Sequence, residues 1–270
     1  MRCVDEGARR ARGWSQGSGG PGATGQVSAR HGLARILSKR GLCSRREAEA
    51  WIRAGRVRLD GRIVRDPECP ADLHAARITI DDMPVAAVDA RYLMLNKPRG
   101  LVTTAHDEHG RDTVYRCFDG AGLGWIAPVG RLDKASEGLL LFSNDPAWAA
   151  RITDPATGPG KTYHVQVDCL PDAERLAALR AGVQVEDEWL RVVSATLLRQ
   201  GAKHAWLEIV LDEGRNRQIR RLLAAFGIGV LRLVRVAIGP LALGDLPKGQ
   251  WRTLTDAEIG LLQQAMQEVD

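Results

Sequence analysis

The stretch Gly130-Arg131-Leu132-Asp133-Lys134-Ala135-Ser136-Glu137-Gly138-Leu139-Leu140-Leu141-Phe142 is the one around which this chain is organised. Its apolar run, 139–142, is short enough for a buried strand. Asp133 precedes that run in a charged, glycine-bounded loop, so we expect it beside a core strand and within reach of a ligand. Catalytic carboxylates are often placed in this way. An Asp133–Arg131 ion pair with no further role is the alternative.

The length, the cysteines and the apolar content limit the class of protein. The 270 residues suit two domains, one small and one large. There is no run of about 18 apolar residues, and no apolar segment follows the N-terminal arginines, so neither a membrane span nor a secretory signal is expected. The five cysteines are scattered and never form Cys-x-x-Cys. This pattern argues against a disulfide framework and a zinc site and is typical of a cytoplasmic protein.

Positive charge is concentrated in one short part of the chain. The net charge is +5, to which residues 1–32 contribute +3, residues 33–65 contribute +7 and residues 66–90 contribute −5. Residues 91–270 are therefore formally neutral. A concentrated basic patch is typical of proteins that bind a nucleic-acid backbone. A solvated basic face without a partner is the alternative.

The first 90 residues divide into a tail and a small module. Residues 1–30 are rich in Gly, Ser and Arg, and we expect a disordered basic tail; a start codon placed too far upstream would give the same sequence. Residues 31–90 predict two short helices, the second opened by a Ser44–Glu47 capping box, and then a hairpin with its turn at Asp60-Gly61. Eight cations lie on the polar faces of this module: Arg35, Lys39, Arg40, Arg45, Arg46, Arg53, Arg56 and Arg58.

Residues 91–270 predict a larger domain. It opens with a strand over 92–97 that is broken by a Pro-x-Gly turn carrying Lys97 and Arg99. Tyr163 alternates with Val165 and Val167, so it faces the side of the strand that carries two core valines. A tyrosine that only packs in the core would give the same pattern.

A basic segment follows the strand predicted over 205–211. The sequence Asp212-Glu213-Gly214-Arg215-Asn216-Arg217-Gln218-Ile219-Arg220-Arg221 places four arginines in seven residues. It stands at the start of a predicted helix, where backbone N–H groups already favour anions. The Gly160-Lys161-Thr162 triplet is not a phosphate-binding loop, because the required earlier glycine is replaced by Pro155 and a strand follows the triplet. Dinucleotide, zinc-helix and serine-nucleophile motifs are also missing from the sequence.

Four stretches together resemble one family. Gly130-Arg131-Leu132-Asp133 with Ser136-Glu137-Gly138-Leu139-Leu140 is similar to the signature of RNA pseudouridine synthases, in particular the bacterial ribosomal branch. The stretches at 92–102, 160–167 and 212–223 resemble other motifs of that branch, in the expected order. Residues 31–90 resemble the RNA-binding module of the small-subunit ribosomal protein S-four.

The resemblance implies a fold and roles for particular residues. The fold would be α+β: a small basic helix and hairpin module, then a domain with a mixed, mostly antiparallel sheet and flanking helices. Asp133 would be the catalytic carboxylate, Tyr163 would lie against the target base, and Arg220, which follows Gln-Ile, would pair with Asp133. Arg217 is the second candidate for that pairing. RNA contacts are expected from the module cations and from Lys97, Arg99, Arg131, Arg215 and Arg217.

The function implied is isomerisation of specific uridines in ribosomal RNA, by a monomer that uses no metal or other cofactor. The stretch 103–111 looks more like large-subunit than small-subunit enzymes, so 23S ribosomal RNA is the preferred substrate and 16S ribosomal RNA the alternative. Two other classes stay open. One is a non-catalytic ribosomal RNA-binding or assembly protein. The other is a glycoside or nucleoside hydrolase, which would need a second acid against Asp133, and only Glu137 is available.

Overall fold

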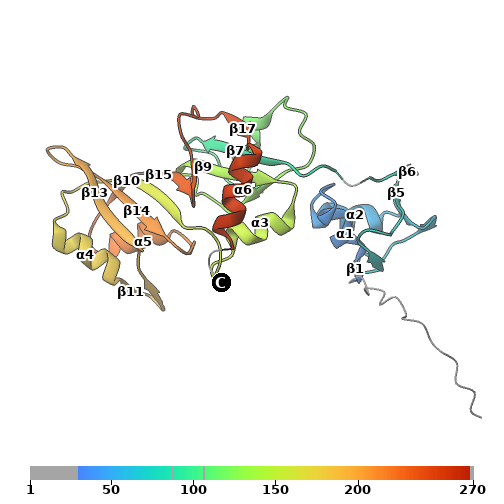
Figure 1. The fold of residues 1–270 in the computed structure, drawn as a ribbon, viewed down its shortest axis with the longest axis horizontal. Coiled ribbons are helices and arrows are strands. Elements are labelled where there is room, and N and C mark those ends of the chain that lie inside the picture. The colour runs from blue at the N-terminus through green and yellow to red at the C-terminus, as the bar shows by residue number, and fades with distance from the viewer. Residues whose placement is uncertain (1–29, 87, 106, 268–270) are drawn as a thin grey trace, which may run out of the picture.

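The computed structural model describes residues 30–86, 88–105 and 107–267 (Figure 1). The basic tail expected over residues 1–30 lies outside this range apart from Arg30. Among the residues described, no helix has the length and apolar composition needed to cross a lipid bilayer.

The N-terminal module contains two helices, a four-stranded sheet in the order β3-β2-β5-β6, and a two-stranded sheet, β1-β4. Its elements are β1 (Arg30–Gly32), α1 (Leu33–Lys39), α2 (Arg45–Arg53), β2 (Val57–Leu59), β3 (Arg62–Ile63), β4 (Pro70–Asp72), β5 (Ile78–Ile80) and β6 (Met83–Pro84).

Local signals set the ends of these elements. The Ser44 hydroxyl accepts a hydrogen bond from the Glu47 N–H at 3.1 Å, which is the Ser44 half of the predicted capping box. Asp60 and Gly61 both have positive φ, +50° and +83°, as a two-residue hairpin turn requires. The helices then bury one apolar face against the sheet, with Leu33, Ile52 and their neighbours fully inaccessible.

The C-terminal domain is built on a large sheet whose main path is β13-β14-β10-β15-β9-β7-β17. All pairs on this path are antiparallel except β15 with β9. The strands are β7 (Tyr92–Lys97), β8 (Ala127–Val129), β9 (Glu137–Ser143), β10 (Lys161–Val167), β13 (Ser194–Gln200), β14 (Ala205–Leu211), β15 (Val230–Ile238), β16 (Leu241–Ala242) and β17 (Trp251–Thr253), and a separate hairpin joins β11 (Val183–Val185) to β12 (Glu188–Leu190). The predicted α+β fold with a mixed, mostly antiparallel sheet is confirmed.

Helices flank this sheet, and Figure 1 places α6 and α3 near β9 and β7, with α4 and α5 near β13 and β14. They are α3 (Pro146–Thr153), α4 (Ala173–Ala181), α5 (Gln218–Ala225) and α6 (Asp256–Ala265), with a short 3₁₀ helix, η1, at Val114–Phe118. Local side chains fix two of these helix starts. Asp145 caps α3 ahead of Pro146, and Thr255 and Glu258 form a complete capping box on α6.

Strand β9 is the centre of the domain, as its sequence predicts. All seven of its residues are buried. Alternate side chains enter two cores, Leu139 and Leu141 on one face and Leu140 and Phe142 on the other. Gly138 is required here because a Cβ atom at this position would lie 2.2 Å from the Arg235 carbonyl oxygen on β15, and its φ is +101°. The strand therefore holds the loop that precedes it in a fixed place.

Candidate active site

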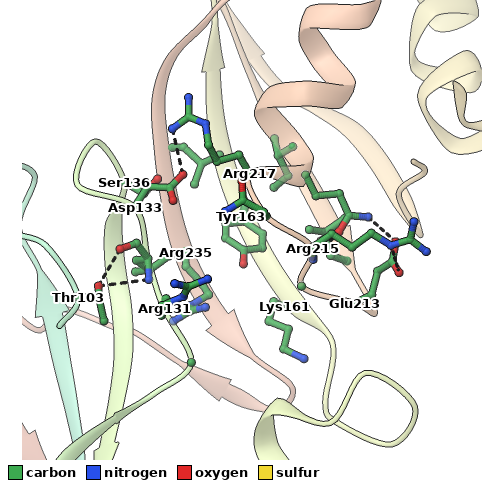
Figure 2. A pocket seen from close by; sticks show the side chains of 18 of the residues that line it. Thr103, Arg131, Asp133, Ser136, Lys161, Tyr163, Glu213, Arg215, Arg217 and Arg235 are labelled. Atoms are coloured by element: carbon green, nitrogen blue, oxygen red, sulfur yellow. Dashed lines mark hydrogen bonds and ion pairs between the residues drawn. The ribbon is translucent and has the colours of Figure 1, made fainter. Parts of the chain in front are cut away.

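A cavity of about 790 Å³ lies between the 129–136 loop, the start of β10, the turn after β14 and strand β15 (Figure 2). Its lining holds seven cationic side chains against two carboxylates. These are Arg131, Lys134, Lys161, Arg215, Arg217, Arg220 and Arg235, with Asp133 and Glu213. The cavity is thus strongly positive although its domain is formally neutral.

Asp133 lies in the loop before β9, with its side chain 35 % exposed to the cavity and solvent. The loop is tied down by its backbone. The Thr103 hydroxyl donates to the Leu132 carbonyl at 2.7 Å, and the Gly100 N–H donates to the Lys134 carbonyl at 2.8 Å. These bonds leave the Asp133 carboxylate oxygens available and fix the backbone that carries them.

Lys97, at the end of β7, holds the backbone of the same loop from within the core. Its ammonium is fully buried and donates three hydrogen bonds, to the carbonyl oxygens of Pro98 (3.1 Å), Asp133 (3.1 Å) and Ser136 (2.8 Å). Burial lowers its pKa to about 8. The predicted RNA contact of Lys97 is therefore wrong, because the ammonium is inaccessible and its three N–H groups are used. Arg99, two residues later, is exposed.

Two arginines approach Asp133 from the basic turn and helix α5. The predicted partner was Arg220, but the ion pair in this structure joins Arg217 Nη1 to Asp133 Oδ2, at 3.5 Å. Arg217 has left-handed backbone, with φ of +49°, and stands just before α5, so its side chain extends into the cavity. This explains why the second candidate reaches the carboxylate.

Arg220 lies in the first turn of α5 and is used differently. Its Nη2 donates to the Ala135 carbonyl at 3.2 Å and its Nη1 to the Val230 carbonyl at 3.5 Å, while its Nε is buried without a partner among the described residues. It therefore touches the Asp133 loop through the backbone of Ala135. Its neighbour Arg221 points elsewhere, pairing with Glu188 at 2.5 Å and Glu186 at 3.3 Å.

Arg215 is held in the turn between β14 and α5. Its Nε donates to Glu213 at 2.8 Å and its Nη1 to the Trp189 carbonyl at 3.1 Å. Gln218 bonds the other oxygen of the Glu213 carboxylate at 2.7 Å. These hydrogen bonds hold the turn together, and Glu213 is therefore not available as a second acid.

Tyr163 projects from β10 into the cavity, on the same strand face as Val165 and Val167 (Figure 2). Its ring is half-buried and packs against both neighbouring cores. In the view of Figure 2 it lies between Asp133 and Lys161. The ring therefore packs against the core, as one interpretation of the sequence predicts, and also faces the cavity, as the other predicts.

Lys161 and Arg235 line the cavity, but neither was singled out from the sequence as a site residue. Lys161 is two residues before Tyr163 on the same strand, so the same alternation that aims Tyr163 could have identified it. Arg235 lies opposite Tyr163 in the register with β15. Only the pairing of the strands reveals that position.

Glu137, the only available second acid, is turned away from the cavity. It is 3 % exposed and bonds Arg232 at 2.8 and 3.0 Å and Lys248 at 2.5 Å. Arg232, and then Lys248, hold the pKa of Glu137 at about 2 despite its burial. Neither Glu137 nor Glu213 is thus a free carboxylate against Asp133, as a hydrolase would require.

The cations of the N-terminal module have mixed environments. Arg40 was predicted to bind RNA, but its Nε and Nη2 are used on the carbonyls of Leu73 and Ala76, so it holds the module together. Four arginines form ion pairs, and all of them except the half-buried Arg58 are exposed: Arg45 with Glu49 and Glu68, Arg53 with Glu49, Arg56 with Asp81, and Arg58 with Asp82. Arg35 and Arg46 are exposed, and Lys39 bonds His31 at 3.2 Å.

Comparison with known proteins identifies both parts of the chain. Residues 91–225 match the RNA pseudouridylate synthase family, and residues 32–71 match the S4 domain. An uncharacterized RNA pseudouridine synthase of Aquifex aeolicus is 36 % identical over 86 % of this chain and 93 % of its own length. The ribosomal large subunit pseudouridine synthase B of Pasteurella multocida is 36 % identical over 86 % of this chain and 69 % of its own.

A solved crystal structure of a pseudouridylate synthase is also similar. It superimposes with a TM-score of 0.61 and 30 % identity, covering 87 % of this chain and all of the solved one. The RNA-binding module and the catalytic domain that the sequence resemblance implied are both confirmed. The chain belongs to the RNA pseudouridylate synthase family, whose members are isomerases.

Proposed function

We propose that this protein converts specific uridines of ribosomal RNA to pseudouridine, with Asp133 as the reacting carboxylate. The observation that supports this most is the position of Asp133, on a rigid loop facing a positively charged cavity that Tyr163 also lines. The two other carboxylates near this loop and turn, Glu137 and Glu213, are already engaged.

The reaction breaks the bond between uracil N1 and ribose C1′, turns the base, and rejoins it to ribose through C5. A proton leaves C5 and a proton is added to N1, so the product is an isomer and no oxidant or energy source is consumed. Asp133 would act as a nucleophile on ribose or as a base that removes a proton. Arg217 would orient the carboxylate, and Arg220 would hold the loop that carries it through the Ala135 carbonyl.

Tyr163 would stack on a base that has left the RNA helix. Removing a base from its stack costs a few kcal/mol, and a ring that faces it recovers part of that cost. Arg99, Arg131, Arg215 and Arg217 would contact phosphates around the cavity. Residues 31–90 would anchor the RNA, and residues 91–270 would carry out the chemistry.

Large-subunit ribosomal RNA is the substrate we propose. The stretch 103–111 resembles large-subunit enzymes, and the relative from Pasteurella multocida is named for that subunit. We expect the protein to act as a monomer, since the cavity with Asp133 and Tyr163 is formed within one chain.

The test is product analysis of 23S and 16S ribosomal RNA transcripts treated with the full-length protein. We expect pseudouridine at a defined position in 23S RNA, and its loss in Asp133→Asn, which keeps the side-chain shape and removes the charge. RNA affinity should stay unchanged in that variant. Pseudouridine in 16S RNA alone would show that the substrate is small-subunit RNA, and free uracil would indicate a hydrolase. An Asp133→Asn rate within tenfold of wild type would overturn the role of Asp133.

A further inference from the structure

The cavity has a second positively charged end, which the proposed role of Asp133 does not use. Lys161 and Arg235 lie there, with only 9 % and 5 % of their surfaces exposed. In Figure 2, Lys161 lies on the other side of the Tyr163 ring from Asp133. Neither residue lies at the open rim, where exposed cations such as Arg131 are found.

The two buried lysines of the catalytic domain differ in how their charge is compensated. Lys97 gives all three of its N–H groups to backbone carbonyls. Lys161 has no hydrogen bond or ion pair within the described chain, and burial, followed by the positive charge of Arg235, lowers its pKa. The Lys161 side chain is otherwise enclosed by protein, and its ammonium, which ordinarily would have acceptors, remains accessible from the cavity. The cavity that it lines is where an acceptor could satisfy it.

Arg235 supports Lys161 from β15. Its Nε donates to the Leu139 carbonyl at 2.7 Å, and one of its terminal nitrogens is buried without a partner in the described residues. Its backbone is fixed by the close contact with Gly138. Arg235 therefore keeps a positive charge in a fixed place, close enough to act on Lys161.

The position of these groups indicates what they bind. Lysine and arginine only donate hydrogen bonds, so the ligand must offer acceptors. An RNA phosphate belongs to a continuous backbone and fits the open rim better than a nearly enclosed site. A base turned out of its helix can enter further, and uracil offers two carbonyl oxygens.

We infer that Lys161 binds a carbonyl oxygen of the target uracil and stabilises the negative charge that forms on the base during the reaction, with Arg235 as a positioning residue. This rests on the proposed function. When the bond between N1 and C1′ breaks, its electron pair stays with the base and is shared by N1 and the carbonyl oxygens. Lys161 keeps its proton throughout and donates a hydrogen bond. Donors placed where charge develops are often worth about 10²–10³ in rate.

The test compares full-length Lys161→Met with wild type on the 23S transcript, using single-turnover rates at saturating protein, RNA affinity and thermal stability. We expect the rate to fall at least about 100-fold, the affinity to change less than threefold, and the Tm to stay equal or rise, because a buried charge is replaced by an apolar side chain of similar length. Lys161→Arg should recover part of the rate.

Lys203→Met is the matched control, since Lys203 is exposed in the turn between β13 and β14, and it should change nothing. A Lys161→Met rate within threefold of wild type would overturn the inference. Weaker RNA binding with an unchanged saturating rate would assign Lys161 to a phosphate instead, and a large fall in Tm would make it structural. If wild type makes pseudouridine and Lys161→Met does so equally fast, only this inference fails. If wild type makes none, the proposed function fails with it.

Discussion

The N-terminal module and the catalytic cavity are both rich in arginine, but their arginines have different surroundings. In the module, Arg56 and Arg58 form ion pairs with Asp81 and Asp82, at 2.5 and 2.7 Å, on an exposed surface. In the cavity, Arg217 is 3.5 Å from Asp133, and Arg220 and Arg235 bond only backbone carbonyls. The cavity therefore keeps most of its positive charge uncompensated.

This difference shows that the net charge of a sequence segment does not predict the electrostatic surroundings of its residues in the folded protein. Residues 33–65 carry +7 and residues 66–90 carry −5. Because β5 pairs with β2, Asp81 and Asp82 of the second segment, which follow β5, pair with arginines of the first. The catalytic domain is neutral by count, yet seven cations and two carboxylates line its cavity.

The largest effect should come from the cavity arginines. Arg220→Lys should lower the single-turnover rate about 100-fold, because one ammonium cannot reproduce a fork that bonds both the Ala135 carbonyl of the Asp133 loop and the Val230 carbonyl. Arg221→Lys is the matched control on the same helix and should stay within threefold of wild type, since Arg221 pairs with Glu186 and Glu188 outside the cavity. Rapid-quench product analysis measures both. Equal losses in the two variants would contradict this difference.

The Arg217→Lys variant tests whether Arg217 or Arg220 orients the Asp133 carboxylate. If Arg217 mainly contacts phosphate, its substitution should weaken RNA binding and spare the saturating rate. A loss of rate larger than that of Arg220→Lys would give Arg217 the orienting role.

Tyr163→Phe should have the next largest effect, about 10- to 100-fold on rate. The ring is kept, so stacking on the base and packing against the core should survive, while the hydroxyl, which we propose as a proton-handling group, is lost. RNA affinity and rate would be measured on the same preparation. An unchanged rate would leave stacking as the only role, and Tyr163→Ala would then have to be the damaging change.

Glu137→Gln should lower the free energy of unfolding by about 2 kcal/mol at pH 7, since it breaks a buried carboxylate's bonds to two partly exposed cations. The folded-state pKa of about 2 lies below the ordinary value of 4.5. The contribution is therefore complete above about pH 4.5 and is lost as the pH falls toward 2. Urea unfolding of both proteins at pH 7 and pH 2.5 measures this, and a difference at pH 2.5 as large as that at pH 7 would contradict it.

The smallest effect should come from single arginines of the module. Arg46→Ala should weaken RNA binding a few-fold and reduce the slope of log affinity against log salt by about 1, because Arg46 is exposed and forms no ion pair within the described chain. Arg56→Ala should do less, since Asp81 already neutralises Arg56. Binding titrations at several salt concentrations compare the two. A larger change from Arg56→Ala would remove the contrast between paired and unpaired arginines.

Much of the fold was readable because its signals are local. The buried run of β9, the caps at Asp145 and Thr255, and the Asp60-Gly61 turn each depend on residues a few positions apart. The loop position of Asp133 and the direction of Tyr163 follow from the same short-range patterns.

The contacts that complete the site join residues far apart in the sequence, and only the tertiary structure decided them. Lys97 meets Ser136 across 39 positions, and Arg217 meets Asp133 across 84. A sequence gives the charge of Lys97, Lys161 and Arg217, but whether such a charge faces solvent, a carbonyl or a cavity depends on which strands pair and how deeply each side chain is buried. The sequence alone thus determined the elements and the reacting carboxylate proposed here. The packing of the sheet decided which cations surround that carboxylate, because burial and pairing are properties of the assembled fold.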